Sequence, residues 1–204
     1  MKKLMNHDSL LMIFAKNPEI GKVKTRLAKT IGNKKALMIY LKLLEHTHAV
    51  ADRVFADKAI FYSEKVQDFD ILDYYKFPKF LQKGKNLGDK MERAFGQAFG
   101  QDYEKVIIIG SDCFELSTEI IEDAFTALDE HNVVIGPAED GGYYLLGMDR
   151  HYPHLFKDKN WSTEDVFLDT LLDIKRLKLS YNILPTLNDV DEEKDLGELR
   201  KHLA

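Results

Sequence analysis

A basic loop near the start of the chain carries the side chains best suited to bind an anion. Within residues 16–29 the only acid is Glu19, although the whole chain has a net charge of −5. A helix that begins in this loop would add its N-terminal dipole, and the combination favours phosphate groups. The glycine spacing of a P-loop or of a dinucleotide-binding turn is absent. A solvated basic start of a helix is the alternative interpretation. The five cations are Lys16, Lys22, Lys24, Arg26 and Lys29.

A single carboxylate follows the most apolar strand candidate, residues 105–110 (KVIIIG). In open α/β sheets, ligands bind beyond the carboxyl ends of the strands, so Asp112 would point into a cleft. An acid at this position is a natural ligand for a divalent cation that also contacts substrate phosphates. Alternatively, Asp112 starts a turn or caps the next helix. We expect its neighbour Cys113 to be a buried packing residue rather than a nucleophile.

Two further acidic motifs lie in the second half of the chain. In GPAEDGGYY (136–144), two glycines beside Asp140 allow a ligand to approach the backbone, although Asp-Gly is also a common hairpin turn. In NDVDEEKDL (188–196), Asp189 and Asp191 would face the same side of an extended segment and could supply a second metal carboxylate. The alternative is that Asp191 caps the terminal helix.

The elements that position these motifs alternate between strand and helix. Strands are expected at residues 10–15, 58–63, 105–110, 133–136, 142–147 and 181–184. Helices are expected at residues 33–54, 86–103 and 192–203, after an N-cap at Ser117, and after a cap at Ser162 or Thr163. This alternation predicts a mostly parallel sheet with helices on both faces. With no repeat or linker, residues 1–204 are expected to form a single domain.

Composition excludes several classes of protein. The chain of 204 residues is 45% hydrophobic, which is enough for a core and excludes a disordered chain. Its negative charge argues against nucleic-acid binding. The apolar run at residues 10–15 is far below the roughly 20 residues of a membrane span, and the polar residues that follow Met5 leave no secretory apolar region. With one cysteine, we expect a reducing, cytoplasmic compartment.

The order of the motifs resembles one known family. The chain is similar to the glycosyltransferase-A-like DUF2064 family, which is related to CofC-type guanylyltransferases and MobA-type nucleotidyltransferases. The resemblance implies a nucleotide-diphospho-sugar transferase fold, a Rossmann-like three-layer sandwich with a mixed sheet. The matching stretches are FAKNPEIGKVKTRL (14–27), LQKGKNLGDKM (81–91), VIIIGSDC (106–113), VIGPAEDGGYYLLG (134–147), LFKDKNW (155–161) and DVDEEKDL (189–196).

The resemblance also implies roles for individual residues and a cofactor, Mg²⁺ or Mn²⁺. Lys24 and Arg26 would contact phosphates, and Asp112 would hold the metal, so these three form the expected catalytic set. Asp191 would be the second ligand, with Asp189 as the alternative. The remaining expected nucleotide-binding residues are Lys16, Gln82, Leu87 and Gly88. The residues expected to face the acceptor or sugar are Asp140, Gly141, Gly142, Tyr143 and Trp161.

Three positions depart from the family pattern: Phe114 and Glu192-Glu193 stand where prolines are usual, and Lys90 replaces an arginine. Arginine and lysine are not equivalent at such a position, because lysine lacks the bidentate fork.

The function expected is metal-dependent nucleotidyl transfer from a nucleoside triphosphate to a small phosphorylated or hydroxyl acceptor. Many glycosyltransferases of this fold carry Asp-x-Asp where this chain has the single Asp112, so glycosyl transfer from a nucleotide sugar is the second hypothesis. A nucleotide-binding module without activity is the third.

Overall fold

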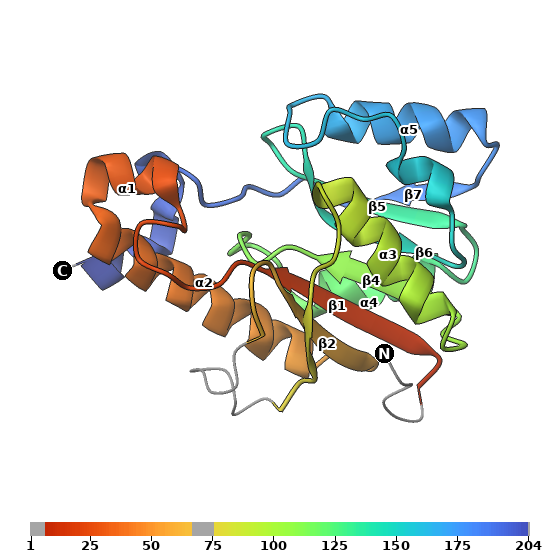
Figure 1. Cartoon of the computed structure of the whole chain (residues 1–204), viewed down its shortest axis with the longest axis horizontal. Helices are drawn as coiled ribbons and strands as arrows, with labels where there is room; N and C mark the ends of the chain where they lie inside the picture. Colours follow the sequence, from red (N-terminus) through yellow and green to blue (C-terminus); the bar gives the residue numbers. More distant parts are fainter. Residues whose placement is uncertain (1–6, 67–75, 204) are drawn as a thin grey trace.

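The computed structural model describes residues 7–66 and 76–203, which contain a seven-stranded mixed sheet (Figure 1). The strand order is β3-β2-β1-β4-β6-β5-β7. Only β6 runs antiparallel to its neighbours, β4 and β5, and every other pair is parallel. The strands are β1 (Ser9–Ala15), β2 (Asp57–Tyr62), β3 (Lys79–Leu81), β4 (Lys105–Ile109), β5 (Val133–Pro137), β6 (Tyr143–Met148) and β7 (Tyr181–Ile183).

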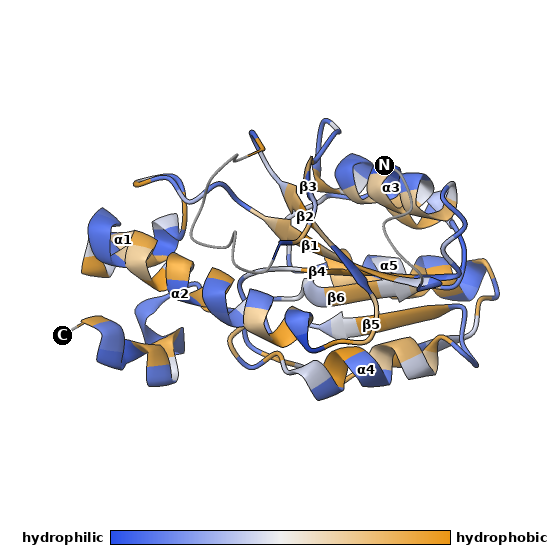
Figure 2. Ribbon diagram, turned by 90° about the horizontal axis from the view of Figure 1, so that it is seen from below, coloured by the Kyte–Doolittle hydropathy of each residue, from blue (hydrophilic) through white to orange (hydrophobic). Residues whose placement is uncertain are grey.

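Helices cover both faces of this sheet, as expected. One face packs against α2 and α4 through Tyr40, Leu44, Ile121 and Phe125. The other face packs against α3, α5 and η2, and the separation into three layers is visible in Figure 2. The helices are α1 (Thr25–Ile31), α2 (Asn33–Asp52), α3 (Leu87–Phe99), α4 (Thr118–Ala127), α5 (Val166–Arg176) and two 3₁₀ helices, η2 (Pro153–Phe156) and η3 (Glu193–Leu203).

The central strands owe their position to uninterrupted apolar sequence. In β1 and β4 nearly every side chain is buried, because helices lie on both sides of the sheet. The Asp140-Gly141 turn joins β5 to β6, which explains the one antiparallel strand. The fold class predicted from the sequence is therefore confirmed.

A small third core fixes the basic loop to the C-terminal segment. Leu27 of α1, Leu43 of α2 and Val190 pack with Leu196 and Leu199 of η3. Because Lys24 precedes α1, Arg26 lies in its first turn and Asp191 precedes η3, this core brings the two charged motifs together across the length of the sequence.

Several predicted boundaries were wrong at the local level. The cap of α5 is Asp165, without a side-chain hydrogen bond, so neither Ser162 nor Thr163 caps that helix. The predicted terminal helix is present as η3; it is a 3₁₀ helix and kinks at Gly197, whose φ is 44°.

The first helix after the basic loop is the separate α1, which ends at Gly32 before α2 begins. Strand β3 lies in the stretch 66–85 that the sequence pattern left unassigned; residues 67–75 of that stretch lie outside the described residues. Ser117 does cap α4, accepting a hydrogen bond from the Ile120 amide at 3.4 Å.

Across the described residues, none of the helices combines the length and the apolar character needed to traverse a bilayer.

Candidate active site

A cleft of about 780 Å³ opens where β1, β2, β3 and β4 end. Its position agrees with the rule that ligands of such sheets bind beyond the carboxyl ends of the strands. Twelve of the residues for which the resemblance implies a site role line this one cleft. They are Lys16, Lys24, Arg26, Gln82, Leu87, Asp112, Asp140, Gly142, Tyr143, Trp161, Asp189 and Asp191.

Lys24 lies at the centre of the charged part of the cleft. It is the residue before α1 and has a left-handed backbone (φ 47°, ψ 46°), which turns its side chain back toward the sheet. The side chain is only 3% exposed, and its Nζ lies 2.7 Å from Oδ1 of Asp112 and 3.2 Å from Oδ1 of Asp191. Burial lowers the Lys24 pKa, but attraction to these carboxylates outweighs it, so the net pKa is raised and the ammonium is retained.

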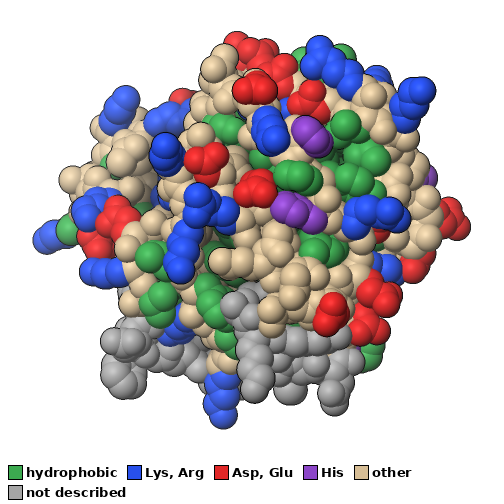
Figure 3. All heavy atoms as spheres, turned by 45° about the vertical axis from the view of Figure 1, so that its right-hand side comes forward, with side chains coloured by type: hydrophobic (Ala, Val, Ile, Leu, Met, Phe, Trp, Pro, Cys, Tyr) green, Lys and Arg blue, Asp and Glu red, His purple; other side chains and the backbone are tan. Residues whose placement is uncertain are grey.

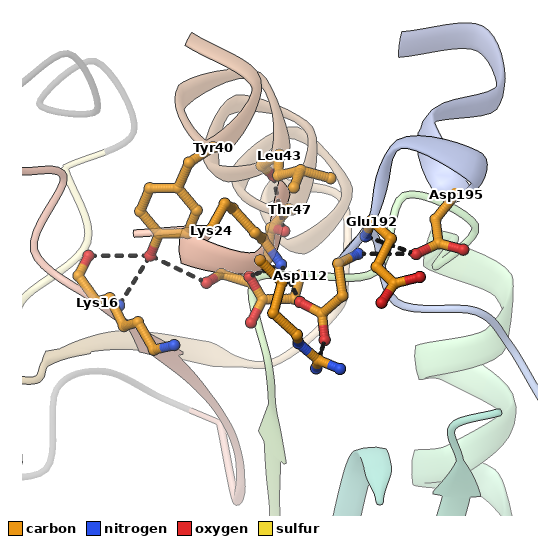
Figure 4. A network of polar contacts seen from close by, with 11 residues as sticks. Lys16, Lys24, Tyr40, Leu43, Thr47, Asp112, Glu192 and Asp195 are labelled. Carbon is orange, nitrogen blue, oxygen red and sulfur yellow. Dashed lines mark hydrogen bonds and ion pairs between the residues drawn. The ribbon is translucent and has the colours of Figure 1, made fainter. Parts of the chain in front are cut away.

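Arg26 forms an ion pair with the other oxygen of Asp191 and is otherwise exposed. Asp191 therefore uses its side chain to bind two cations and does not cap the terminal helix. Asp195, the third residue of η3, reaches back instead: its Oδ2 accepts hydrogen bonds from the amides of Asp191 (3.1 Å) and Glu192 (2.7 Å), as the N3 residue of a capping box does (Figure 4). Asp195 thereby orients the turn that carries Asp191.

The two acidic motifs are held side by side by backbone contacts. The amide of Val190 donates to the carbonyl oxygen of Asp112 (2.9 Å), and Cys113 forms a β-bridge with Asp189. Burial, and then repulsion from Asp112, raise the pKa of Asp189 to about 7. The thiol of Cys113 is buried as expected, and burial raises its pKa to about 12.

Tyr40 is a site residue that the sequence pattern had assigned only to the core. Its hydroxyl donates to the carbonyl oxygen of Lys16 (2.9 Å), accepts from the Lys16 amide (2.8 Å) and lies 3.3 Å from Oγ of Ser111 (Figure 4). It fixes the backbone at the end of β1 beside the loop after β4. A lone tyrosine at a helical core position carries no sequence signal for this role.

Gln82 and Asn17 bind backbone at the strand ends. The Gln82 amide donates to the carbonyl oxygens of Phe61 (2.8 Å) and Ala15 (3.3 Å), so it joins the ends of β1 and β2 while lining the cleft. The buried Asn17 side chain donates to the Lys65 carbonyl oxygen at 2.8 Å. Both residues shape the walls of the cleft.

The glycine-rich turn at Asp140 is both a hairpin turn and a part of the cleft wall, the two interpretations that the sequence left open. Asp140 accepts a hydrogen bond from the Gly142 amide at 2.9 Å, which closes the hairpin, and both residues still line the cleft. Gly141 lies outside the lining. With a φ of 85°, it packs so closely that a Cβ there would lie 1.9 Å from the carbonyl oxygen of Glu164. Its role is to let the segment before α5 approach the turn.

Gly88 also supports a wall without lining the cleft. A Cβ at this position would lie 2.1 Å from Cε2 of Trp161, so the indole rests directly on the first turn of α3. Trp161 also stacks on Phe156, with ring centroids 6.3 Å apart. The neighbouring Lys159, almost fully buried, forms an ion pair with Asp173 of α5 and so fixes this segment to the helix.

The cations of the cleft divide into two groups. Lys24 and Arg26 are bound to carboxylates, and Lys22 pairs with Glu19 at 2.7 Å. Lys16 and Lys90 also line the cleft, and their ammonium groups form no ion pair with the part of the chain that the structure describes. These two groups are available to a bound anion.

The carboxylates of the cleft suit a hard divalent cation that is also coordinated by phosphate oxygens of a substrate. Asp112, Asp189 and Asp191 offer carboxylate oxygens, the ligand type that Mg²⁺ prefers. Within residues 7–66 and 76–203, no group of three histidine, cysteine or acidic side chains is placed to hold a metal ion by itself. This arrangement fits Mg²⁺, which is commonly held by one or two carboxylates with substrate phosphates and water.

Comparison with solved structures places the fold among nucleotide-processing transferases. A provisionally named nucleotide-diphospho-sugar transferase from Desulfovibrio desulfuricans G20 is 34% identical, with a TM-score of 0.87 over 97% of this chain and 88% of that one. The inositol-1-phosphate CTP transferase of T. maritima shares the fold (TM-score 0.56, 12% identity, 95% and 94% covered). Among curated proteins, the 2-phospho-L-lactate guanylyltransferase of Methanocaldococcus jannaschii is 27% identical over 187 residues, 90% of this chain and 79% of that protein.

The fold and the cleft define a transferase of the glycosyltransferase-A-like, nucleotide-diphospho-sugar transferase class. More particularly, the chain belongs to the family described as "Uncharacterized protein conserved in bacteria (DUF2064)", whose model matches residues 44–163.

Proposed function

We propose that the protein is a nucleotidyltransferase, in which a small phosphorylated or hydroxyl acceptor attacks the α-phosphorus of a nucleoside triphosphate and pyrophosphate leaves. One observation carries this proposal: Lys24 lies between Asp112 and Asp191 in a cleft that Lys16 and Lys90 also line. Triphosphate chemistry needs cations for the phosphates and carboxylates for a metal in one place.

Lys24 and Arg26 are suited to bind the leaving pyrophosphate. Both are bound to carboxylates without substrate, and a polyphosphate would compete with those carboxylates for the same N–H groups. Their charges would then stabilise the negative charge that develops on the leaving group. No nucleophilic side chain is required, because the acceptor itself attacks phosphorus.

Asp112, with Asp191 or Asp189, would hold Mg²⁺. Bound there, the ion would neutralise charge on the phosphate oxygens. Burial, and then repulsion from Asp112, raise the pKa of Asp189, and a divalent cation beside these carboxylates would offset that repulsion. Among the three, Asp112 and Asp191 are the better candidates, since both are already ion-paired in the cleft.

The names of the relatives guide the choice of substrates. Guanylyl transfer to 2-phospho-L-lactate is the activity that the curated relatives' names state, so GTP with this acceptor is the first pair to test. A phosphorylated, carboxylated acceptor is compatible with the ammonium groups of Lys16 and Lys90 that line the cleft.

Glycosyl transfer is the second candidate, favoured by the name of the Desulfovibrio structure. Product analysis separates the two reactions. Each nucleoside triphosphate and nucleotide sugar is incubated with Mg²⁺ and a panel of phosphorylated and hydroxylated acceptors. Pyrophosphate release that depends on an acceptor supports nucleotidyl transfer, whereas release of a nucleoside diphosphate from a nucleotide sugar would replace it with glycosyl transfer.

A further inference from the structure

Helix α5 presents an unpartnered apolar stripe to solvent. Its inner face is buried through Val166, Thr170 and Ile174, which pack toward the sheet. On the opposite face, Leu168 is 56% exposed and Leu172 is 50% exposed. Residues four positions apart share one face of a helix, so these two leucines form a continuous apolar surface.

Charges of opposite sign lie at the two ends of this stripe. Asp165 precedes the first turn of α5, and Lys175 and Arg176 lie in the last turn. Neither Asp165 nor Lys175 forms an ion pair with any residue that the structure describes. Arg176 contacts Asp173 on its own helix (3.2 Å) and is 76% exposed. In the upper part of the face in Figure 3, the level at which α5 lies in Figure 1, acidic, basic and hydrophobic side chains lie close together.

The arrangement of leucines and charges on α5 is complementary to the same arrangement on a second α5 that runs in the opposite direction. If two α5 helices run antiparallel about a twofold axis midway between Leu168 and Leu172, Leu168 of one copy faces Leu172 of the other. Asp165 then faces Lys175 of the other copy at both ends of the contact. A surface that matches its own reversed copy is the defining property of an isologous interface.

We infer that the outer face of α5 is a docking surface for a second copy of this chain. Beyond the helix, Ile183 (44% exposed) lies in β7, two residues after Tyr181, which packs in the same core as Ile174 of α5. A helix of 11 residues spans about 16 Å and is too short to bury the roughly 800 Å² per partner of a standard interface. The edge strand β7, which pairs only with β5 among the described strands, extends the surface.

Sedimentation equilibrium of the full chain over a range of concentrations tests the inference. The wild type is expected to form a dimer, and Leu168→Ser/Leu172→Ser is expected to weaken it about tenfold or more, since buried interface anchors each contribute more than 1 kcal/mol. Phe55→Ser is the matched control, because Phe55 is 77% exposed and lies in the turn between α2 and β2, away from α5. Circular dichroism checks that each variant is folded.

A charge exchange tests the antiparallel geometry itself. Asp165→Lys and Lys175→Glu are each expected to weaken the dimer, because each places like charges opposite one another. The double variant Asp165→Lys/Lys175→Glu is expected to restore it. A wild type that stays monomeric overturns the inference, as does a dimer unchanged by the leucine substitutions or a double variant no tighter than the singles.

Discussion

At the scale of single residues, the site depends on Lys24. Its ammonium is buried between two carboxylates, and its left-handed backbone is the conformation that delivers it there. A buried cation of this kind has two effects. It holds Asp112 near Asp191 before substrate binds, and it occupies space beside the oxygens that a divalent ion would use.

Replacing Lys24 with methionine separates these effects. We expect Lys24→Met to lower the free energy of unfolding by about 1–3 kcal/mol, because Asp112 and Asp191 lose a shared counter-ion but stay partly solvated. Turnover should fall about 100-fold or more, since a charge that stabilises the leaving group is lost. Mg²⁺ alone should raise the melting temperature of the variant more than that of the wild type. Lys29→Met is the control, because Lys29 is exposed in the last turn of α1 and lies outside the lining of the cleft. Equal shifts with Mg²⁺ in Lys24→Met and wild type would contradict this role.

Asp189 predicts a pH dependence of stability. Its pKa is about 7 in the folded chain against an ordinary 3.8, so the folded state binds the proton more tightly. The stability that this proton adds to the folded state is therefore fully present below about pH 4 and is lost as the pH rises to about 7. The free energy of unfolding falls over this range by at most about 4 kcal/mol.

Asp189→Asn removes this titration. Urea unfolding in EDTA, measured from pH 4 to pH 8, should show the wild type losing stability relative to Asp189→Asn as the pH rises. Parallel profiles for the two proteins would mean that Asp189 titrates normally.

At the scale of elements, regular periodicity was predictable, whereas short strands and the ends of helices were not. Apolar strands such as β1 and β4 are evident in the sequence because both faces are buried. The three-residue β3 has no such run, and the end of η3 depends on packing against α1 and α2 rather than on local propensity. The cap of α5 was misassigned because Ser162 and Thr163 are used in the turn before it; Thr163, for example, donates to the Asn160 carbonyl oxygen.

The contact between α3 and the segment at Trp161 gives a prediction at this scale. Gly88→Ala places a methyl group where the indole lies, so we expect a loss of about 1–3 kcal/mol of stability. Because Trp161 is the only tryptophan, its fluorescence should move to longer wavelength as the ring becomes more exposed.

Gly96→Ala is the matched control in the same helix. The nearest atom to a Cβ there is Cε1 of the His151 side chain at 3.0 Å, which can move, and alanine favours the helix by about 1 kcal/mol. An unchanged emission spectrum in Gly88→Ala would show that the indole does not depend on this contact.

At the scale of the whole molecule, the fold explains why motifs spread along the sequence meet. The strand ends of β1 and β4 and the segment before η3 open into one cleft, so the motifs predicted the charged residues Lys24, Asp112 and Asp191 of its lining. What the sequence could not supply was the pairing of Lys24 with two acids, or the support from Tyr40 and Asp195, because these contacts depend on packing between distant segments. Gly88 and Gly141 were predicted as ligand contacts and instead support the walls.

The central claim, a cleft built for a metal-bound polyphosphate, is tested most directly by thermal unfolding with ligands. We expect one nucleoside triphosphate with Mg²⁺ to raise the melting temperature by about 5–10 °C at 100 times its dissociation constant, since binding there adds about 2.7 kcal/mol. Asp112→Asn should lose most of the Mg²⁺-dependent part of this shift while keeping its fold. A shift given only by nucleotide sugars would favour glycosyl transfer. If no nucleotide of either kind shifts the wild type, with or without Mg²⁺, the metal and phosphate site proposed for this cleft is wrong.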